Sequence, residues 1–270
     1  MNKALLLLLL FLSACASTSR MEVAQNIAAS TNLSRHIIHT ETFNFNSYER
    51  IDVKGATAHI YIEGDGLAWV GRYTPSNDPT PKNPLALKLA AQDPSDNVVY
   101  LARPCQYVRS ETCEQKYWTS HRFTSEVIAA MDEALDDMKI RHDITGFHLI
   151  GFSGGGNVAA LLAARRNDII SLRTVAGNLD HALLHDIHDV SQIPDSLNAK
   201  DIAHQINHIP QHHFIGEKDK VVPPEIAQSF IEASSKTSCI RSTTVADATH
   251  QKFWSEIWPA LLGYPVTCTN

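Results

Sequence analysis

The sequence predicts an α/β fold: one domain with a mostly parallel sheet and helices on both faces. Short apolar or β-rich runs alternate with helical segments in units of about 30 residues, which is typical of strands joined by crossover helices. The 270 residues are 44% hydrophobic and 19% charged, a composition typical of one large globular domain. In such sheets ligands gather at the carboxyl ends of the strands, so residues that directly follow a strand are the first site candidates.

Charge and histidine distribution argue against two classes of partner. The net charge is −6 and no basic run is present, which argues against nucleic acid. The 14 histidines are scattered and lack the Cys or Glu spacing of zinc sites. Nothing in the sequence requires a metal or an organic cofactor, and none is expected.

The first residues have the features of an export signal. A lysine at position 3 is followed by an apolar run over 4–12, too short to span a bilayer as a mature helix. The run ends in Leu-Ser-Ala-Cys at 12–15, which resembles the bacterial lipobox. That resemblance implies a signal peptide over 1–14, cleavage before Cys15, lipid on Cys15 and a lipid-anchored tether over 15–41. An ordinary secretory signal with an incidental cysteine is the alternative.

Acylation of Cys15 would attach the protein to a membrane of the cell envelope. Ala16 is not the Asp associated with inner-membrane retention, so the resemblance favours the outer membrane, facing the periplasm. Export also affects the remaining cysteines, because disulfides form in oxidising compartments. Four cysteines allow three pairings, and closeness in sequence favours Cys105 with Cys113 and Cys239 with Cys268.

The predicted domain covers 42–270, and its elements follow in order. An alternating stretch predicts a half-exposed edge strand over 42–48. Further strands are predicted at 59–62, 97–101, 147–150, 169–176, 212–216 and 242–245. Helices are predicted at 84–91, 123–138, 157–164 and 251–258. A further helix is predicted after the loop at 217–224 and includes residues 230 and 231. Loops at 67–83 and 102–122 and a small helical insertion at 181–207 are expected to build a pocket, with Trp69, Tyr73, Tyr117 and Trp118 as candidate lining residues.

A G-x-S-x-G turn over 151–155 is the feature around which the site is predicted. An apolar strand leads into it and an Ala/Leu-rich helix leads out. Glycines at these positions allow the tight turn that raises the Ser153 hydroxyl above the sheet. The helix directs its N-terminal N–H groups at an oxyanion beside Ser153, with Gly154 as one donor. A glycine-rich loop that binds phosphate, or simply turns, is the alternative.

The second N–H donor is predicted in the Glu-Gly-Asp-Gly turn at 63–66. Acyl-transfer enzymes with such a serine turn bind the oxyanion with two backbone N–H groups. One belongs to the residue after the nucleophile and one to a loop after an earlier strand. This turn resembles the His-Gly turn of α/β-hydrolases, with Glu63 in place of His and with Asp65 or Gly66 as the donor. An ordinary glycine-rich β-turn is the alternative.

The order Ser153, Asp219, His250 is the chain order of the α/β-hydrolase superfamily, which the chain resembles from about residue 42 to its end. The resemblance rests on the Gly-Phe-Ser-Gly-Gly turn, the Gly-Glu-Lys-Asp-Lys-Val-Val-Pro loop and the Ala-Thr-His turn. It implies an α/β-hydrolase fold and a triad in which Ser153 is the nucleophile, His250 the base and Asp219 the orienting acid.

Other residues compete for two of these roles. Asp180 also follows a predicted strand, and Glu217 lies in the same loop as Asp219. His250 is the histidine in the last strand-to-helix turn, and nearby Asp247 is expected in a turn.

The sequence thus predicts a lipid-anchored cell-envelope serine hydrolase that cleaves an ester, thioester or amide. Its substrate is expected to be a small-molecule or peptide acyl compound, with a short-chain carboxylester favoured over a peptide. A non-catalytic envelope lipoprotein that uses this fold as a binding module is the alternative.

Overall fold

A computed structural model describes residues 19–235 and 238–268. Eight strands form one sheet in the order β1-β2-β6-β3-β7-β8-β9-β10. β1 and β2 are antiparallel to each other, β2 is antiparallel to β6, and the remaining neighbours are parallel. The strands are β1 Ser34–His39, β2 Asn44–Ile51, β3 Ala58–Ile62, β6 Asn97–Leu101, β7 Phe147–Phe152, β8 Ile169–Val175, β9 Gln211–Gly216 and β10 Ile240–Val245. The mostly parallel sheet predicted from the sequence is confirmed.

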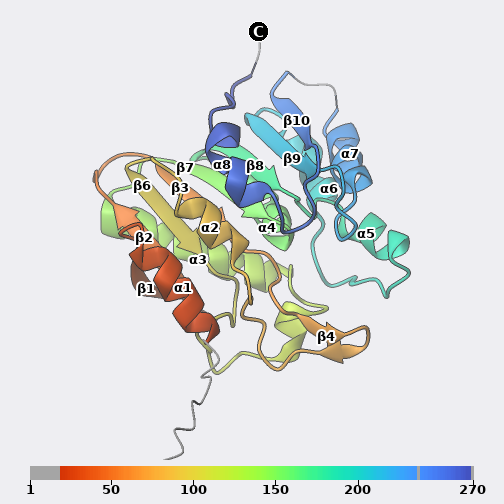
Figure 1. Cartoon of the computed structure of the whole chain (residues 1–270), viewed down its shortest axis with the longest axis horizontal. Helices are drawn as coiled ribbons and strands as arrows, with labels where there is room; N and C mark the ends of the chain where they lie inside the picture. Colours follow the sequence, from red (N-terminus) through yellow and green to blue (C-terminus); the bar gives the residue numbers. More distant parts are fainter. Residues whose placement is uncertain (1–18, 236–237, 269–270) are drawn as a thin grey trace, which may run out of the picture.

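Helices cover both faces of this sheet (Figure 1). Buried residues of α1 Arg20–Ala29, α2 Leu85–Ala90 and α8 Trp254–Leu262 pack on one face. Buried residues of α3 Ser125–His142, α4 Gly154–Arg165 and α7 Pro224–Ala233 pack on the other. Each layer removes a continuous apolar surface from water, which is the main stabilising contribution of such a fold.

The insertion between β8 and β9 is helical, as expected. It contains α5 His181–Ile187, α6 Ala199–Ile202 and the 3₁₀ helix η2 Ala203–Ile206. The excursion after β6 contains the 3₁₀ helix η1 Gln115–Trp118. The stretch 67–83, expected to be a loop, also forms a small hairpin of β4 Trp69–Gly71 and β5 Thr74–Pro75.

The N-terminal part differs from the expected tether over 15–41. Ser19 caps α1 through a reciprocal capping box with Glu22, and β1 pairs with β2 along its whole length. The fold therefore includes α1 and β1, which precede the expected start at residue 42. The strand expected at 42–48 is present as β2, but its expected place at the edge is wrong, because β1 takes the edge and β2 lies between β1 and β6. Cys15 and the signal peptide expected over 1–14 lie outside the described residues.

Polar residues on β2 explain the misleading alternation. Asn46 and Ser47 are fully buried, yet both are hydrogen-bonded: Asn46 Oδ1 accepts from Arg35, and the Ser47 hydroxyl donates to Glu49. A polar residue can occupy a buried strand when its hydrogen bonds are made inside the protein. Within the described ranges, no helix is long and apolar enough to cross a membrane.

Two disulfides join Cys105 to Cys113 and Cys239 to Cys268, the two pairs favoured by closeness in sequence. The first closes a loop on the 102–122 excursion. The second ties the segment after α8 to the start of β10, and it closes the longer loop.

Removal of the second disulfide should destabilise the protein more than removal of the first. The sequence separations are 29 and 8 residues, which correspond to about 3.5 and 2.5 kcal/mol of chain entropy lost from the unfolded state. Equilibrium unfolding in urea should therefore show a larger loss of unfolding free energy for Cys239→Ser/Cys268→Ser than for Cys105→Ser/Cys113→Ser. Equal losses, or the reverse order, would contradict the entropic account.

Candidate active site

Ser153 lies at a sharp turn between β7 and α4. Its φ of 52° and ψ of −122° are a strained combination for a residue with a side chain. The glycines two residues to either side permit this turn. A Cβ at Gly151 would lie 2.3 Å from the Gly155 carbonyl oxygen, and a Cβ at Gly155 would lie 2.3 Å from that of Ile62. Only glycine fits both positions, and the turn therefore presents the Ser153 side chain at the carboxyl edge of the sheet.

Three side chains from separate strand ends meet at this edge. His250 Nε2 is 3.0 Å from Ser153 Oγ, and His250 Nδ1 is 2.8 Å from Asp219 Oδ2. The carboxylate can only accept, so Nδ1 carries the proton and Nε2 is left to accept the hydrogen bond of the serine hydroxyl. The structure thus brings Ser153, His250 and Asp219 into one continuous hydrogen-bonded chain.

Backbone contacts hold the acid and the imidazole in place. The second oxygen of Asp219 accepts the N–H groups of Val221 at 2.8 Å and Val222 at 2.9 Å. The ring of Phe152 packs beside the ring of His250, with centroids 5.1 Å apart. The Asp219 carboxylate is inaccessible to solvent, so its two oxygens are fully used by the protein.

The competing acids lie elsewhere. Asp180 caps α5 by accepting the Leu183 N–H, and its carboxylate also binds Asn198, Ser229 and Lys200. Glu217 is exposed. Asp247 is exposed and pairs with Lys218 in a turn. None of these carboxylates is a partner of His250.

The 63–66 turn packs directly against the serine turn. A Cβ at Gly64 would lie 3.1 Å from the Ser153 Cβ, and a Cβ at Gly154 would lie 2.0 Å from Asp65 Oδ1. Gly66 instead approaches Pro79 and Gln106, and its φ of +66° favours glycine. Of the two predicted donors in this turn, Asp65 is therefore the one that lies beside Gly154, the residue after the serine.

Two arginines hold Asp65, and no sequence pattern indicated either of them. The Asp65 carboxylate lies 3.3 Å from Arg103 Nη1 and 3.2 Å from Arg122 Nε. Burial lowers the pKa of Arg103 to about 10, and the charge of Asp65 opposes this effect. Arg122 also donates to His185 of α5 at 3.0 Å. The carboxylate is thus the link between the turn, the 102–122 excursion and the insertion.

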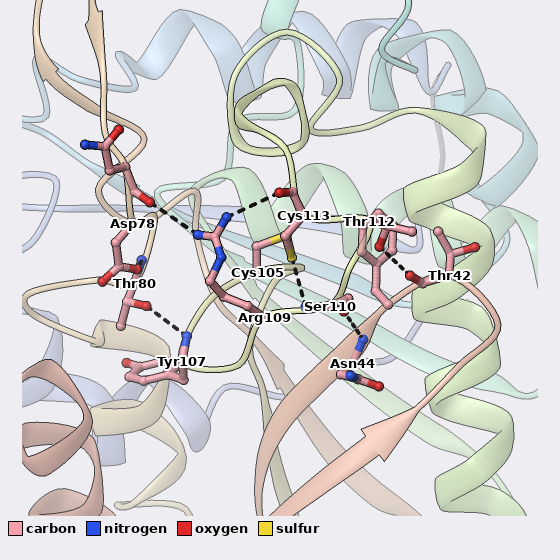
Figure 2. The surroundings of a disulfide bond; sticks show 12 residues. Thr42, Asn44, Asp78, Thr80, Cys105, Tyr107, Arg109, Ser110, Thr112 and Cys113 are labelled. Carbon is pink, nitrogen blue, oxygen red and sulfur yellow. Dashed lines mark hydrogen bonds between the residues drawn. A yellow bond between two sulfur atoms is a disulfide. The ribbon is translucent and has the colours of Figure 1, made fainter.

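The disulfide loop supports the same turn. Gln106, next to Cys105, donates to the Gly64 carbonyl at 3.0 Å. Figure 2 shows how the loop is fixed around the disulfide: the Tyr107 N–H donates to Thr80 Oγ1, and Arg109 donates to the Cys113 carbonyl. On the other side, the Thr112 hydroxyl donates to the Thr42 carbonyl (Figure 2). The loop is therefore tied both to the segment after β5 and to the start of β2.

A cleft of about 1260 Å³ opens above Ser153 and His250. All three loop regions expected to form a pocket contribute to it, and the 220–222 segment beside Asp219 adds a wall that the sequence did not indicate. Its apolar lining comprises Leu67, Ala68, Trp69, Tyr73, Phe152, Leu184, Val190, Ile193, Val221 and Val222. Tyr117 and Trp118, also candidates for the lining, are buried away from it. In the described part of the chain, no group of His, Cys, Asp and Glu residues could hold a metal ion.

The fold and the serine turn define an α/β-hydrolase, and comparisons with known proteins agree. Residues 86–250 match the model of the family described as Serine hydrolase (FSH1), so the chain belongs to this family. It is a serine hydrolase of the α/β type. The matched region contains Ser153, Asp219 and His250, whereas the 63–66 turn precedes it. A comparison with curated proteins finds no match.

Solved structures share the fold at low sequence identity. A putative α/β hydrolase from Agrobacterium tumefaciens has a TM-score of 0.58 at 17% identity, covering 85% of this chain and 91% of that chain. Est1E from Butyrivibrio proteoclasticus has a TM-score of 0.59 at 14% identity, covering 84% and 95%. The esterase Pf2001 from Pyrococcus furiosus has a TM-score of 0.63 at 14% identity, covering 87% and 92%. These similarities concern the fold.

Glu63, which stands where the resemblance expects His, is almost fully buried beside the Asp65 turn. Burial raises the pKa of its carboxyl to about 7, although the Gly64 N–H donates to it at 2.9 Å and opposes the shift. The folded protein thus keeps a proton there that the unfolded chain releases near its ordinary pKa of 4.5. Glu63 therefore makes the protein lose stability as pH rises from about 4.5 to 7.

The substitution Glu63→Gln should remove this loss. The amide stays neutral and keeps an oxygen for the Gly64 N–H. The free energy of unfolding of the variant relative to wild type should rise by on the order of 3 kcal/mol between pH 4.5 and pH 8, measured by urea unfolding at both pH values. Glu225→Gln, on the exposed side of α7, is the control and should show no such rise. An equal pH dependence of the two variants would refute a buried, protonated Glu63.

Proposed function

We propose that this chain is a lipid-anchored hydrolase of the bacterial cell envelope that cleaves a carboxylic ester through a Ser153–His250–Asp219 triad. The observation that carries the catalytic part is the hydrogen-bonded chain of these three side chains at the floor of the cleft. A thioester or amide would follow the same steps.

The chemistry follows from which atom holds each proton. Ser153 Oγ attacks the ester carbonyl carbon while its proton passes to His250 Nε2. The imidazolium then gives that proton to the leaving alcohol oxygen, and an acyl-enzyme remains. A water molecule next loses a proton to Nε2 and attacks the acyl carbon, and Ser153 recovers the proton as the carboxylic acid leaves. Asp219 keeps the Nδ1 proton in place throughout and stabilises the charged ring.

The negative charge on the substrate oxygen needs fixed donors. The Gly154 N–H is the first of α4, at the positive end of the helix dipole. The Asp65 N–H is the second donor in this proposal, because Asp65 lies beside Gly154 and its side chain is fixed by Arg103 and Arg122. Each such donor contributes about 3 to 4 kcal/mol to stabilisation of the transition state.

Substitutions in the triad test this assignment. Ser153→Ala should lower kcat for a p-nitrophenyl ester by at least about 10⁴-fold and abolish labelling by a fluorophosphonate, with the circular dichroism unchanged. Asp219→Asn should lower kcat about 10⁴-fold, whereas Asp180→Asn should leave kcat within a few fold and lower stability instead. Ser125→Ala, exposed at the start of α3, is the control serine.

Full activity or labelling in Ser153→Ala would remove the triad proposal. A wild-type protein that is never labelled would favour the alternative of a binding module. A screen of purified protein against esters of increasing chain length and against aminoacyl amides tests the bond that is cleaved.

Lipid attachment at Cys15 is the second part of the proposal. It is supported by the Leu-Ser-Ala-Cys sequence and by two disulfides, which suit an exported protein. Several acyl chains on one residue give stable membrane attachment. Ala16 favours the outer membrane and its periplasmic side.

The mass of the mature N-terminal peptide tests this attachment. We expect an N-terminal Cys15 that carries diacylglycerol, and we expect Cys15→Ser to lose both the lipid and the membrane fraction of the protein. A mature protein cleaved nearby without added lipid mass would instead show an ordinary secretory signal. Chains cut after residue 14 with a free thiol would likewise contradict lipid attachment.

A further inference from the structure

The β4–β5 hairpin exposes large apolar side chains. Trp69 is 44% exposed, Val70 61% and Tyr73 81%. Arg72 lies between Val70 and Tyr73 and packs its guanidinium over the Tyr73 ring. Adjacent exposed apolar residues on a projecting element are typical of an interaction surface. Tryptophan and tyrosine flanked by basic residues suit the boundary between lipid headgroups and acyl chains.

This hairpin forms one side of the cleft mouth. Trp69 and Tyr73 line the cleft together with Val190 and Val221, which are also exposed. Arg72 reaches across to the Asp189 carbonyl at 3.2 Å. The exposed cations Lys82 and Lys220 lie on the same rim. A surface that bound this rim would therefore lie directly over the entrance to Ser153.

The beginning of α1 is fixed to the base of the same hairpin. Arg20 donates to the carbonyls of Asp78 and Thr80 at 3.0 and 2.8 Å, and it pairs with the Asp78 carboxylate at 3.2 Å. The base itself is closed by hydrogen bonds from Leu67 to Pro79 and from Ser76 to Ala68. In Figure 1 the hairpin and the first turn of α1 accordingly lie along the same lower edge of the molecule.

The distance from this edge to a lipid on Cys15 is limited by covalent geometry. Four residue steps separate Cys15 from Ser19, the first described residue. Even when fully extended, such a chain spans at most about 14 Å. A lipid on Cys15 would therefore hold the start of α1, and the edge of the molecule on which it lies, close to the bilayer. The opposite edge of the molecule could not face the bilayer at the same time.

We infer that the β4–β5 hairpin docks onto the phospholipid bilayer surface, so that the cleft mouth faces the membrane and takes an acyl ester from it. This inference rests on the lipid attachment and ester hydrolysis proposed above. It adds an orientation and a source of substrate: a lipid ester at the headgroup level, whose acyl part enters between the hairpin and the 190–193 segment. Lys82 and Lys220 then face the lipid phosphates, whereas the Arg72 guanidinium is paired with the Asp189 carboxylate at 3.8 Å.

Intrinsic tryptophan fluorescence tests the docking directly. Of the four tryptophans in the chain, Trp118, Trp254 and Trp258 are buried, and Trp69 is exposed. The mature lipidated protein would be reconstituted into phosphatidylethanolamine and phosphatidylglycerol vesicles, with and without lipids brominated on their acyl chains. Bromine quenches only nearby indoles, so quenching is expected in wild type and should be abolished in Trp69→Phe.

Activity provides the second measurement. Val70 is exposed on the hairpin and does not line the cleft. Val70→Asp should lower turnover of a lipid ester presented in vesicles about tenfold, because a carboxylate on the hairpin opposes its burial at the interface. Turnover of a soluble p-nitrophenyl ester should stay the same. The control is Ile140→Asp: Ile140 is 79% exposed, against 61% for Val70, but it lies near the end of α3. There the His142 carbonyl accepts the N–H of Gly55, which precedes β3.

The outcomes distinguish a failure of membrane docking from a failure of the proposed lipid attachment or ester hydrolysis. The mass of the N-terminal peptide and the soluble-ester activity are measured on the same sample. A lipidated, active protein whose Trp69 is not quenched overturns the docking alone. So does equal vesicle activity in the Val70 and Ile140 variants. If sedimentation shows that the wild type self-associates and that Val70→Asp does not, a second copy covers the hairpin, and this result also overturns membrane docking.

Discussion

The site depends on the parallel pairing of β3 with β7. Ile62, the last residue of β3, lies opposite Gly151, so the turns that follow the two strands meet at one edge of the sheet. The contact is close enough that only glycine fits at position 155, against the Ile62 carbonyl. This one register brings Asp65 beside Gly154 and sets the distance between Ser153 and the proposed oxyanion donors. A slip of one residue would separate them and turn the strand side chains to the wrong face.

In the electrostatics of the turn, two buried arginines share one partly buried carboxylate. Asp65 has two arginine partners, and Arg122 continues to His185, whose pKa is lowered by burial and by the Arg122 charge. Neutral His185 can accept from Arg122 through Nε2 while Nδ1 donates to the Ser191 carbonyl at 2.6 Å. Removing one member of such a group leaves another charge buried without a partner, which is strongly destabilising. The network therefore favours one position of the turn and of α5 relative to it.

Much of the fold could be predicted from the sequence because its signals are local. The strand before Ser153, the G-x-S-x-G spacing and the turns at Asp219 and His250 each occupy a few consecutive residues, and the structure brings these three side chains together. Arg103 and Arg122 were missed because their role exists only through contacts with Asp65, which is distant from both along the chain. β1 was missed for another reason. It is an exposed edge strand, and only Ile38 along it is fully buried, so no alternation marks it.

The loop that supplies Asp219 also forms a wall of the cleft. The backbone N–H groups of Val221 and Val222 bind the carboxylate, and the same two residues line the cleft. A substitution at position 221 or 222 that changes the shape of the cleft would therefore also change how Asp219 holds the His250 imidazole. To widen the cleft for bulkier acyl groups, laboratory evolution would disturb the Asp219–His250 pair less at 190–193, which has no bond to Asp219, than at 221 and 222.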